Sequence, residues 1–248
     1  MLYAILSDVH ANPVALETAL ADARVQGAKK VVCLGDVVGY GPDAVRAVEL
    51  ARSACDVVLL GNHDAATAGM ISAANFRPEA QAGVRRHAKE LSAEALAWLR
   101  TCPLVLRTRT FVAAHGTLDH PEEFGYILRA DQAYRAFEAM GDGNLLFVGH
   151  THVSMWCARG RRGMMTADRT DDLTLKDGVQ YVVNVGSVGY PRCESESVYV
   201  LYDSRRRTVV WRRLPFDFKG YFKQMKDRKI FIAPWLESRA AQSGDKSC

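Results

Sequence analysis

Five short polar fragments, each directly after an apolar run, constrain the fold of this chain more than any other feature. The runs have the length of buried strands, and the fragments hold all but two of the seven histidines. The runs are Leu2–Ser7, Val31–Leu34, Val57–Leu60, Phe111–Ala114 and Leu145–Val148. The fragments are Asp8-x-His10, Gly35-Asp36, Gly61-Asn62-His63-Asp64, His115-Gly116 and Gly149-His150-Thr151-His152. Ligands of an open α/β sheet bind outside the carboxyl ends of its strands. The pattern therefore predicts Asp, His and Asn side chains, which suit divalent metals, at one sheet edge.

Length and composition indicate one large domain, which we expect to span residues 1–248. The 248 residues are 48% hydrophobic, enough for a sizeable core, and no run approaches the roughly 20 apolar residues of a membrane span. The first strand begins at once and no basic segment precedes it, so a cytoplasmic location is expected. The polar stretch 240–248 is expected to be a frayed tail.

The cysteine pattern argues against a disulfide framework and against a thiolate zinc site. None of the six cysteines forms a C-x-x-C pair, which is typical of reduced, mostly buried thiols. The six are Cys33, Cys55, Cys102, Cys157, Cys193 and Cys248.

The net charge of +4 makes nucleic-acid binding an unfavoured interpretation. Three local basic clusters, at 159–162, 205–207 and 223–229, are interpreted as solvated loops and turns. A milder alternative is that they attract anionic substrates. Nothing in the sequence indicates an oligomeric state.

The first half alternates strand and helix, which implies a parallel sheet. Asn12 suits a helix N-cap and Pro13 the first helical position, for a helix to about Gln26. Pro42 is predicted to open a second helix through Leu50. Residues 65–101 read as helical, with a helix capped by Ser92 and a first part that walls one side of the site.

The second half has short strands separated by turns, with one helix near residues 131–140, which is typical of a more antiparallel sheet. Its further strands are predicted at 104–106, 180–185, 197–202 and 208–213. Two such sheets packed together with helices outside would form an α/β sandwich.

The polar fragments supply enough ligands for two metal ions. Asp8 and His10 are two residues apart, as are His150 and His152, so each pair can face one cavity. Asp36 has two carboxylate oxygens and could bridge the ions. We assign Asp8, His10, Asp36 and His152 to one metal, and Asp36, Asn62, His115 and His150 to the other. Two metals about 3.5–4 Å apart can hold a bridging hydroxide for in-line attack at phosphorus.

The remaining histidines receive different interpretations. His63 could act as a general acid, with Asp64 orienting its ring, and a structural role is the alternative. His87, in a basic helical run, is expected at the surface. His120, in a turn, receives no role, although it could line the rim of the site.

Together these residues resemble the calcineurin-like metallophosphoesterases. Gly35-Asp36-Val37-Val38-Gly39-Tyr40-Gly41-Pro42 and the stretch 184–192, NVGSVGYPR, look like the bacterial phosphodiesterase-type branch of that family. The resemblance implies a four-layer αββα sandwich of two mixed sheets, the metal ligands assigned above, and His63 as general acid. It implies two divalent metals, with manganese preferred and iron, zinc or nickel as alternatives.

One departure from the protein-phosphatase branch bears on the substrate. That branch carries an arginine after its Gly-Asp-x-Val motif, where this chain has Tyr40. The implied activity is therefore hydrolysis of a phosphodiester bond in a small phosphorylated substrate, a class that includes nucleotides. Tyr40 and Arg192 are the residues expected to contact the substrate. The alternatives are a phosphoprotein phosphatase, a dinucleoside polyphosphate hydrolase and a non-catalytic interaction scaffold.

Overall fold

Strands and helices alternate through the first part of the chain, as predicted. A computed structural model describes residues 1–192 and 194–242. In it, β1 (Leu2–Leu6), β2 (Lys30–Cys33) and β3 (Val57–Val58) are parallel neighbours, joined through α1 (Pro13–Val25) and α2 (Ala44–Ala54). The Asn12 side chain caps α1 by accepting a hydrogen bond from the Ala15 amide, which confirms that prediction. Helix α2 starts later than predicted, because Asp43 rather than Pro42 marks its N-terminus and accepts from the Arg46 amide.

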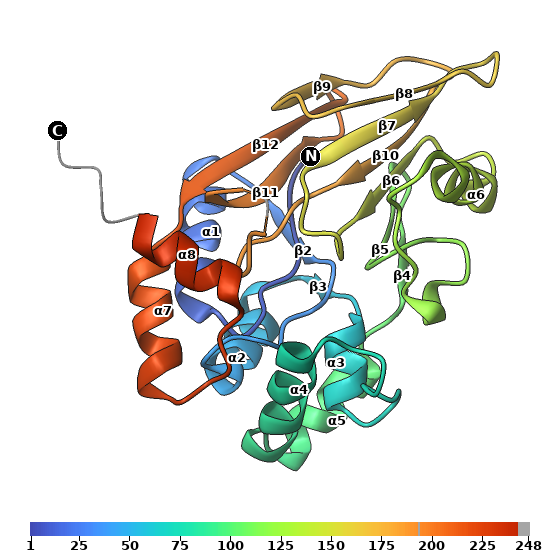
Figure 1. The fold of residues 1–248 in the computed structure, drawn as a ribbon. Coiled ribbons are helices and arrows are strands. Elements are labelled where there is room, and N and C mark those ends of the chain that lie inside the picture. Colours follow the sequence, from blue (N-terminus) through green and yellow to red (C-terminus); the bar gives the residue numbers. More distant parts are fainter. Residues whose placement is uncertain (193, 243–248) are drawn as a thin grey trace, which may run out of the picture.

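The strands form two six-stranded mixed sheets (Figure 1). The first sheet has the order β3-β2-β1-β11-β12-β9, with β9 (Asp172–Thr174), β11 (Glu196–Asp203) and β12 (Thr208–Pro215) antiparallel to their neighbours. The second has the order β4-β5-β6-β10-β7-β8. Its parallel centre is β5 (Val112–Ala114), β6 (Leu145–Val148) and β10 (Gln180–Asn184). Its antiparallel edges are β4 (Val105–Arg107), β7 (Met155–Arg159) and β8 (Met165–Asp168).

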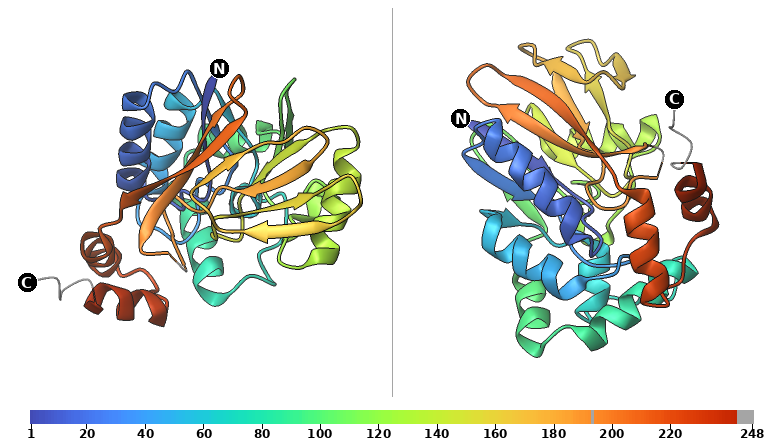
Figure 2. Two further views of the ribbon diagram at one scale, coloured as in Figure 1. Left: turned by 90° about the horizontal axis from the view of Figure 1, so that it is seen from above. Right: turned by 90° about the vertical axis from the view of Figure 1, so that its left-hand side faces the viewer.

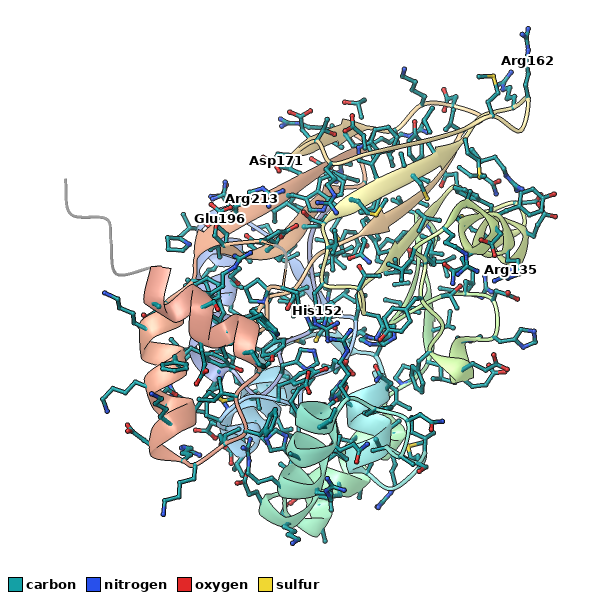
Figure 3. All side chains as sticks on the ribbon, in the orientation of Figure 1. Arg135, His152, Arg162, Asp171, Glu196 and Arg213 are labelled. Atoms are coloured by element: carbon teal, nitrogen blue, oxygen red, sulfur yellow. The ribbon has the colours of Figure 1, made fainter. Side chains whose placement is uncertain are left out.

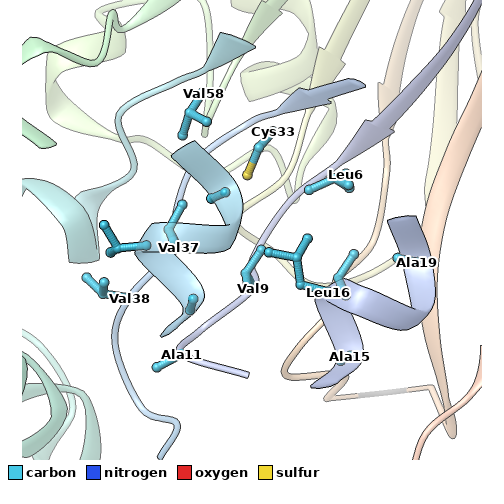
Figure 4. Packing of buried hydrophobic residues seen from close by; sticks show 14 of the residues in the cluster. Leu6, Val9, Ala11, Ala15, Leu16, Ala19, Cys33, Val37, Val38 and Val58 are labelled. Carbon is cyan, nitrogen blue, oxygen red and sulfur yellow. The ribbon is translucent and has the colours of Figure 1, made fainter. Parts of the chain in front are cut away.

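The sheets pack face to face with helices on their outer faces, which confirms the predicted four-layer sandwich (Figure 2). Between the sheets, Ile5 and Leu34 from the side of the first sheet pack with Phe111 and Phe147 from the side of the second in one buried cluster. Helices α1 and α2 cover the other face of the first sheet, where Leu16 packs among the side chains shown in Figure 4. Helix α6 (Ala130–Met140) covers the second sheet. Burial of both sheet faces is the expected result for largely parallel strands of near-continuous apolar residues.

Three helices follow β3 and border the edge where the strands end. They are α3 (Asn62–Thr67), α4 (Pro78–Glu90) and α5 (Ala93–Thr101), and a 3₁₀ turn spans Pro121–Glu123. The Ser92 hydroxyl caps α5 as predicted. Among the described residues, no helix has the length and apolar character that crossing a membrane requires.

Two C-terminal helices, α7 (Phe218–Asp227) and α8 (Pro234–Gln242), were not predicted. Most of the basic cluster 223–229 lies on α7, so its interpretation as a loop was wrong; its charges lie on the outer side of a helix whose other side is apolar. The cluster at 205–207 does lie in the turn between β11 and β12. Residues 240–242 of the predicted tail belong to α8, and 243–248 lie outside the described residues.

The described cysteines behave as predicted. Cys33, Cys55, Cys102 and Cys157 are free thiols. Burial raises the pKa of the Cys55 and Cys102 thiols to about 12, so they stay protonated and apolar in character. Cys193 and Cys248 lie outside the described residues.

Candidate metal centre

The polar fragments meet at one edge of the two sheets, as the strand pattern predicted. His152, labelled in Figure 3, lies in the middle of the molecule, below the strands and above α3 and α4. All seven predicted metal ligands are buried, although each is polar or charged. They are Asp8, His10, Asp36, Asn62, His115, His150 and His152. Buried polar groups need partners, so the contacts among these side chains decide what the site can hold.

The first cluster consists of Asp8, His10 and His152. The Nε2 atoms of His10 and His152 are 3.1 Å apart. They lie 3.6 Å and 3.2 Å, respectively, from Asp8 Oδ1. Each ring donates its Nδ1–H to a backbone carbonyl, that of Val38 for His10 (3.0 Å) and that of Tyr190 for His152 (2.6 Å). In the neutral rings, both Nε2 lone pairs therefore point toward Asp8.

The second cluster consists of Asn62, His115 and His150. His115 donates its Nδ1–H to the Leu34 carbonyl at 3.0 Å, so in the neutral ring its Nε2 is the acceptor and the potential metal ligand. This Nε2 lies 3.2 Å from Asn62 Oδ1 and 3.1 Å from His150 Nδ1. Three potential ligand atoms therefore converge here as well, and one of them is a neutral amide oxygen.

Asp36 lies between the two clusters. Its Oδ2 is 3.7 Å from His10 Nε2 and 3.3 Å from His115 Nε2. Its other oxygen, Oδ1, accepts the His63 amide at 2.8 Å, which fixes the orientation of the carboxylate. Asp36 Oδ2 thus lies within 3.7 Å of a potential ligand atom of each cluster, as a bridging ligand would require.

The backbone of the ligand residues is unusual. Five of them have φ between 47° and 66°, the left-handed region that residues other than glycine rarely adopt. They are Asp8, His10, Asp36, His150 and His152. The turns are also crowded: a Cβ on Gly149 would lie 2.0 Å from Ser7 Oγ and 2.6 Å from Asp8 Oδ2. Glycine in this motif therefore serves to bring His150 close to Asp8, whose Oδ2 accepts the His150 amide at 2.9 Å.

The electrostatics show what the ligands do in the absence of a metal. Burial opposes ionisation of Asp36, but the nearby His115, His63 and His10 together outweigh it and lower the pKa of Asp36. Burial likewise opposes a charge on His115, yet Asp36 raises the pKa of His115 to about 9. Burial lowers the pKa of His150 to about 3 and that of His152 to about 4. Asp36 thus favours a proton on His115, and a metal bound at this position would replace that proton.

The donor set fits divalent metal ions. Asp8 Oδ1 is buried and has no hydrogen-bond donor among the described residues, although it is a charged oxygen. The first cluster and the group Asp36, His115 and His150 each bring their ligand atoms within 4.8 Å of one another. Carboxylate oxygens combined with imidazole nitrogens suit manganese, iron, zinc and nickel, and the carbonyls behind the imidazoles set the tautomer that ligation requires.

His63 lies beside the first cluster, and Asp64 does not bind its ring. The His63 and His10 rings are 4.9 Å apart. The Asp64 carboxylate instead accepts the amides of Val38 (3.0 Å) and Gly61 (3.2 Å). His63 Nδ1 is buried without a described hydrogen-bond partner, and the idea that Asp64 orients this ring through a hydrogen bond is therefore not supported. Gly39 packs on the ring instead, because a Cβ there would lie 2.2 Å from Nδ1.

A cavity of about 620 Å³ opens over the second cluster. Asn62, His63 and His150 line it, together with both residues that were predicted to contact the substrate, Tyr40 and Arg192. The Arg192 guanidinium donates to the Tyr40 hydroxyl at 3.0 Å, although the two residues are 152 positions apart. Tyr40 stands where the protein-phosphatase branch has an arginine, and Arg192 brings a guanidinium to the same cavity from a distant segment.

His87 was expected at the surface, and the structure contradicts this. Its side chain is fully buried, where its Nδ1 accepts the Gly39 amide at 3.0 Å and its Nε2 donates to the Gly41 carbonyl at 3.1 Å. His87 thus holds the loop that carries Tyr40. The 3.6-residue helical period would have indicated the burial of His87, because the buried face of α4 consists of Ala80, Gly83, Val84 and His87. His120 is exposed, and its ion-pair partners among the described residues are the neighbouring Asp119 and Glu122.

The comparisons with known proteins agree with this geometry. Residues 1–207 match the model of the calcineurin-like phosphoesterase superfamily domain. The chain is 30% identical over 244 residues to the uncharacterized protein MJ0912 of Methanocaldococcus jannaschii, covering 96% of each chain. It is similar to the crystal structure of a metallophosphoesterase from Sphaerobacter thermophilus, with 32% identity, a TM-score of 0.83, and coverage of 97% of this chain and 98% of that one. The hypothetical protein PH1004 of Pyrococcus horikoshii shares the fold at 18% identity, with a TM-score of 0.75 and coverage of 96% and 97%. This chain therefore belongs to the calcineurin-like phosphoesterase superfamily.

Proposed function

We propose that this protein is a metal-dependent hydrolase of phosphodiesters. One observation carries the proposal: the lone pairs of buried imidazoles and carboxylates converge on two points that share Asp36, next to a cavity large enough for an organic phosphoester. The first metal would be held by Asp8, His10, Asp36 and His152, and the second by Asp36, Asn62, His115 and His150. Manganese is the ion that we favour.

The protein supplies the environment for the reaction. When bound, two divalent ions polarise a phosphoryl group and activate water at neutral pH. His63 lines the cavity and is the proposed proton donor to the leaving group. Burial lowers the pKa of His63, whereas the Asp36 carboxylate acts to raise it. An anionic substrate acts in the same direction as Asp36 and so favours the protonated ring.

The preference for diesters depends on the charge around the cavity. A monoester dianion carries more negative charge than a diester and is bound well by an arginine clamp. Tyr40 replaces such an arginine, which supports a diester, and its ring can contact an ester substituent. Arg192 supports the alternative of monoester, dinucleoside polyphosphate or phosphoprotein hydrolysis, because its guanidinium lines the same cavity.

The test compares kcat/KM for an aryl phosphodiester, its monoester analogue and a phosphoserine peptide with the same added metal. We expect the diester to be the best substrate. Arg192→Met should then change diester turnover less than monoester turnover, with Arg205→Met, in an exposed turn, as the control. If the monoester or the peptide is preferred, the diester proposal is wrong, and loss of that preference in Arg192→Met would assign it to the Arg192 guanidinium. Absence of turnover with every metal would favour the interaction scaffold.

A further inference from the structure

A second, smaller pocket adjoins the cavity over the metal centre. Its volume is about 220 Å³, below the roughly 300–1,000 Å³ of a typical small-molecule site, so it suits one ring system rather than a whole ligand. Three of its lining residues, Tyr40, Arg77 and Arg192, also line the larger cavity. The other three are Glu79, Tyr190 and Trp235. A ligand could therefore extend from the metal centre, past the two arginines, into this side pocket.

The boundary between the two pockets is cationic. Within residues 1–192 and 194–242, neither Arg77 nor Arg192 forms an ion pair with a carboxylate. Arg192 is half-buried, and its described hydrogen bond goes to the neutral hydroxyl of Tyr40. A partly desolvated guanidinium without a counter-charge is unfavourable, and an anionic ligand group would supply the missing partner.

The interior of the side pocket has a different chemistry. The half-buried Trp235 provides aromatic surface, and its ring meets that of the buried Tyr190 edge to face at 5.0 Å. Glu79 provides a carboxylate that accepts hydrogen bonds from N–H or O–H groups and repels a second anion. The combination suits a planar ring that carries hydrogen-bond donors, attached to a phosphate that remains at the arginines.

Trp235 comes from the C-terminal helices, which lie beyond the 207 residues that match the family model. Helices α7 and α8 pack against Tyr40 and Tyr190 through an apolar cluster. Arg228 of the α7 C-terminus donates to the Pro42 carbonyl next to the Tyr40 loop (2.7 Å), and Arg239 of α8 donates to the Glu194 carbonyl after Arg192 (2.7 Å). The C-terminal helices thus contribute Trp235 to the wall of this pocket. Both helices lie at the left of the molecule in Figure 1.

We infer that the side pocket is a nucleotide subsite, in which the base contacts Trp235 and a phosphate lies between Arg77 and Arg192. This rests on the proposed function, because the scissile phosphoester would occupy the metal centre beyond that phosphate. The substrate class is then a nucleotide that carries a further phosphoester or phosphoanhydride bond, rather than a small aryl ester.

Direct binding tests the subsite independently of turnover. Calorimetric titrations of the purified protein with adenosine 5′-monophosphate, adenosine and inorganic phosphate should give the tightest binding for the nucleotide. Trp235→Ala should weaken nucleotide binding roughly tenfold or more, the effect expected from loss of one base–aromatic contact, and Trp235→Phe should recover most of it. Phe231→Ala removes an exposed aromatic residue shortly before α8 and is the matched control.

Each outcome has a distinct meaning. If the nucleotide binds no more tightly than inorganic phosphate, or if Phe231→Ala weakens binding as much as Trp235→Ala, there is no nucleotide subsite. The kcat/KM ratio of a nucleotide ester to bis(p-nitrophenyl) phosphate should also fall in Trp235→Ala, and an unchanged ratio contradicts the inference. If the wild-type protein hydrolyses no phosphoester with any divalent metal, the proposed function fails, whatever the titrations show.

Discussion

The two ligand clusters differ in charge and in access, although they share Asp36. The first cluster contributes a second carboxylate, Asp8, whereas the second contributes the neutral amide of Asn62. Of the described residues that line the large cavity, Asn62 and His150 belong to the second cluster and none belongs to the first. Greater negative charge and deeper burial favour tight, slowly exchanging metal binding. We therefore expect the first site to hold its ion permanently and the second to exchange its ion and to meet the substrate.

The largest effect is expected from Asp36→Asn, which removes the ligand common to both clusters. Metal content should fall at both sites, and turnover should decrease by orders of magnitude because two-metal activation is lost. Elemental analysis and steady-state kinetics measure these changes. Asp56→Asn, which alters an aspartate in a surface ion pair with Lys30, is the control. A variant that retains one full metal equivalent and most of its activity would show that the clusters work independently.

His63→Ala should reduce the rate by about 10²–10⁴-fold, the usual contribution of general acid catalysis, while both metals remain. The loss should shrink for substrates whose leaving groups are acidic enough to depart without a proton. His120→Ala, at an exposed histidine, serves as the control. Loss of one metal equivalent in His63→Ala would instead make His63 part of the first cluster, which its distance from His10 would permit.

Titration with a chelator tests the asymmetry directly. Metal should leave in two steps, with apparent affinities that differ by about tenfold or more, a range that changes around a metal ligand commonly produce. Asn62→Ala should remove the weaker step, and Asp8→Asn should lower the affinity of the tighter one. A single step in the wild-type protein would contradict the difference in affinity between the two sites. Removal of the tighter step by Asn62→Ala would reverse the assignment of the two sites.

Of these substitutions, His87→Leu should reduce turnover least. Its effect should reach the metal ligands of the first cluster. His87 holds the Gly39–Gly41 loop, and the preceding residue, Val38, accepts the His10 Nδ1–H. We expect the free energy of unfolding to fall by about 1–3 kcal/mol, because buried backbone groups lose their partner. Turnover should fall roughly tenfold, with faster metal loss from the tighter step. Lys89→Leu, on an exposed position of the same helix, controls for the added apolar side chain.

The pH dependence of the free energy of unfolding tests whether His87 is neutral in the folded protein. Burial lowers the pKa of His87 to about 3 in the folded protein, below its ordinary value of 6.5. The unfolded chain therefore binds a proton that the folded chain does not, and stability falls as the pH decreases from about 6.5 toward 3. His87→Gln should take up fewer protons on unfolding in this range than the wild-type protein. Equal pH slopes for the two proteins would show that His87 is protonated in the fold.

The sequence predicted what depends on strand ends and failed where side chains pack across the fold. Asp8 and His10, or His150 and His152, follow apolar runs, and sheet topology alone brings such residues together. Tyr40 and Arg192 were both predicted to contact the substrate, but no local pattern predicts the hydrogen bond between them, because a contact across 152 residues depends on the packed structure. The partners of Asp64 are backbone amides, which carry no sequence signal. His87 was missed because two flanking arginines concealed the helical period of its buried face.

The left-handed backbone at five ligand residues has a consequence for how such a protein changes over evolution. The left-handed backbone of each of these residues raises the free energy of the folded state by about 1 kcal/mol relative to glycine at the same position. Replacement of a ligand by glycine would relieve this strain, but it would also lose buried hydrogen bonds such as that from the His150 amide to Asp8, so folding alone gives these side chains little net advantage. Selection for chemistry, rather than for folding, must maintain these side chains. A lineage released from that selection can lose the ligands one at a time, with little net change in stability, and keep the scaffold.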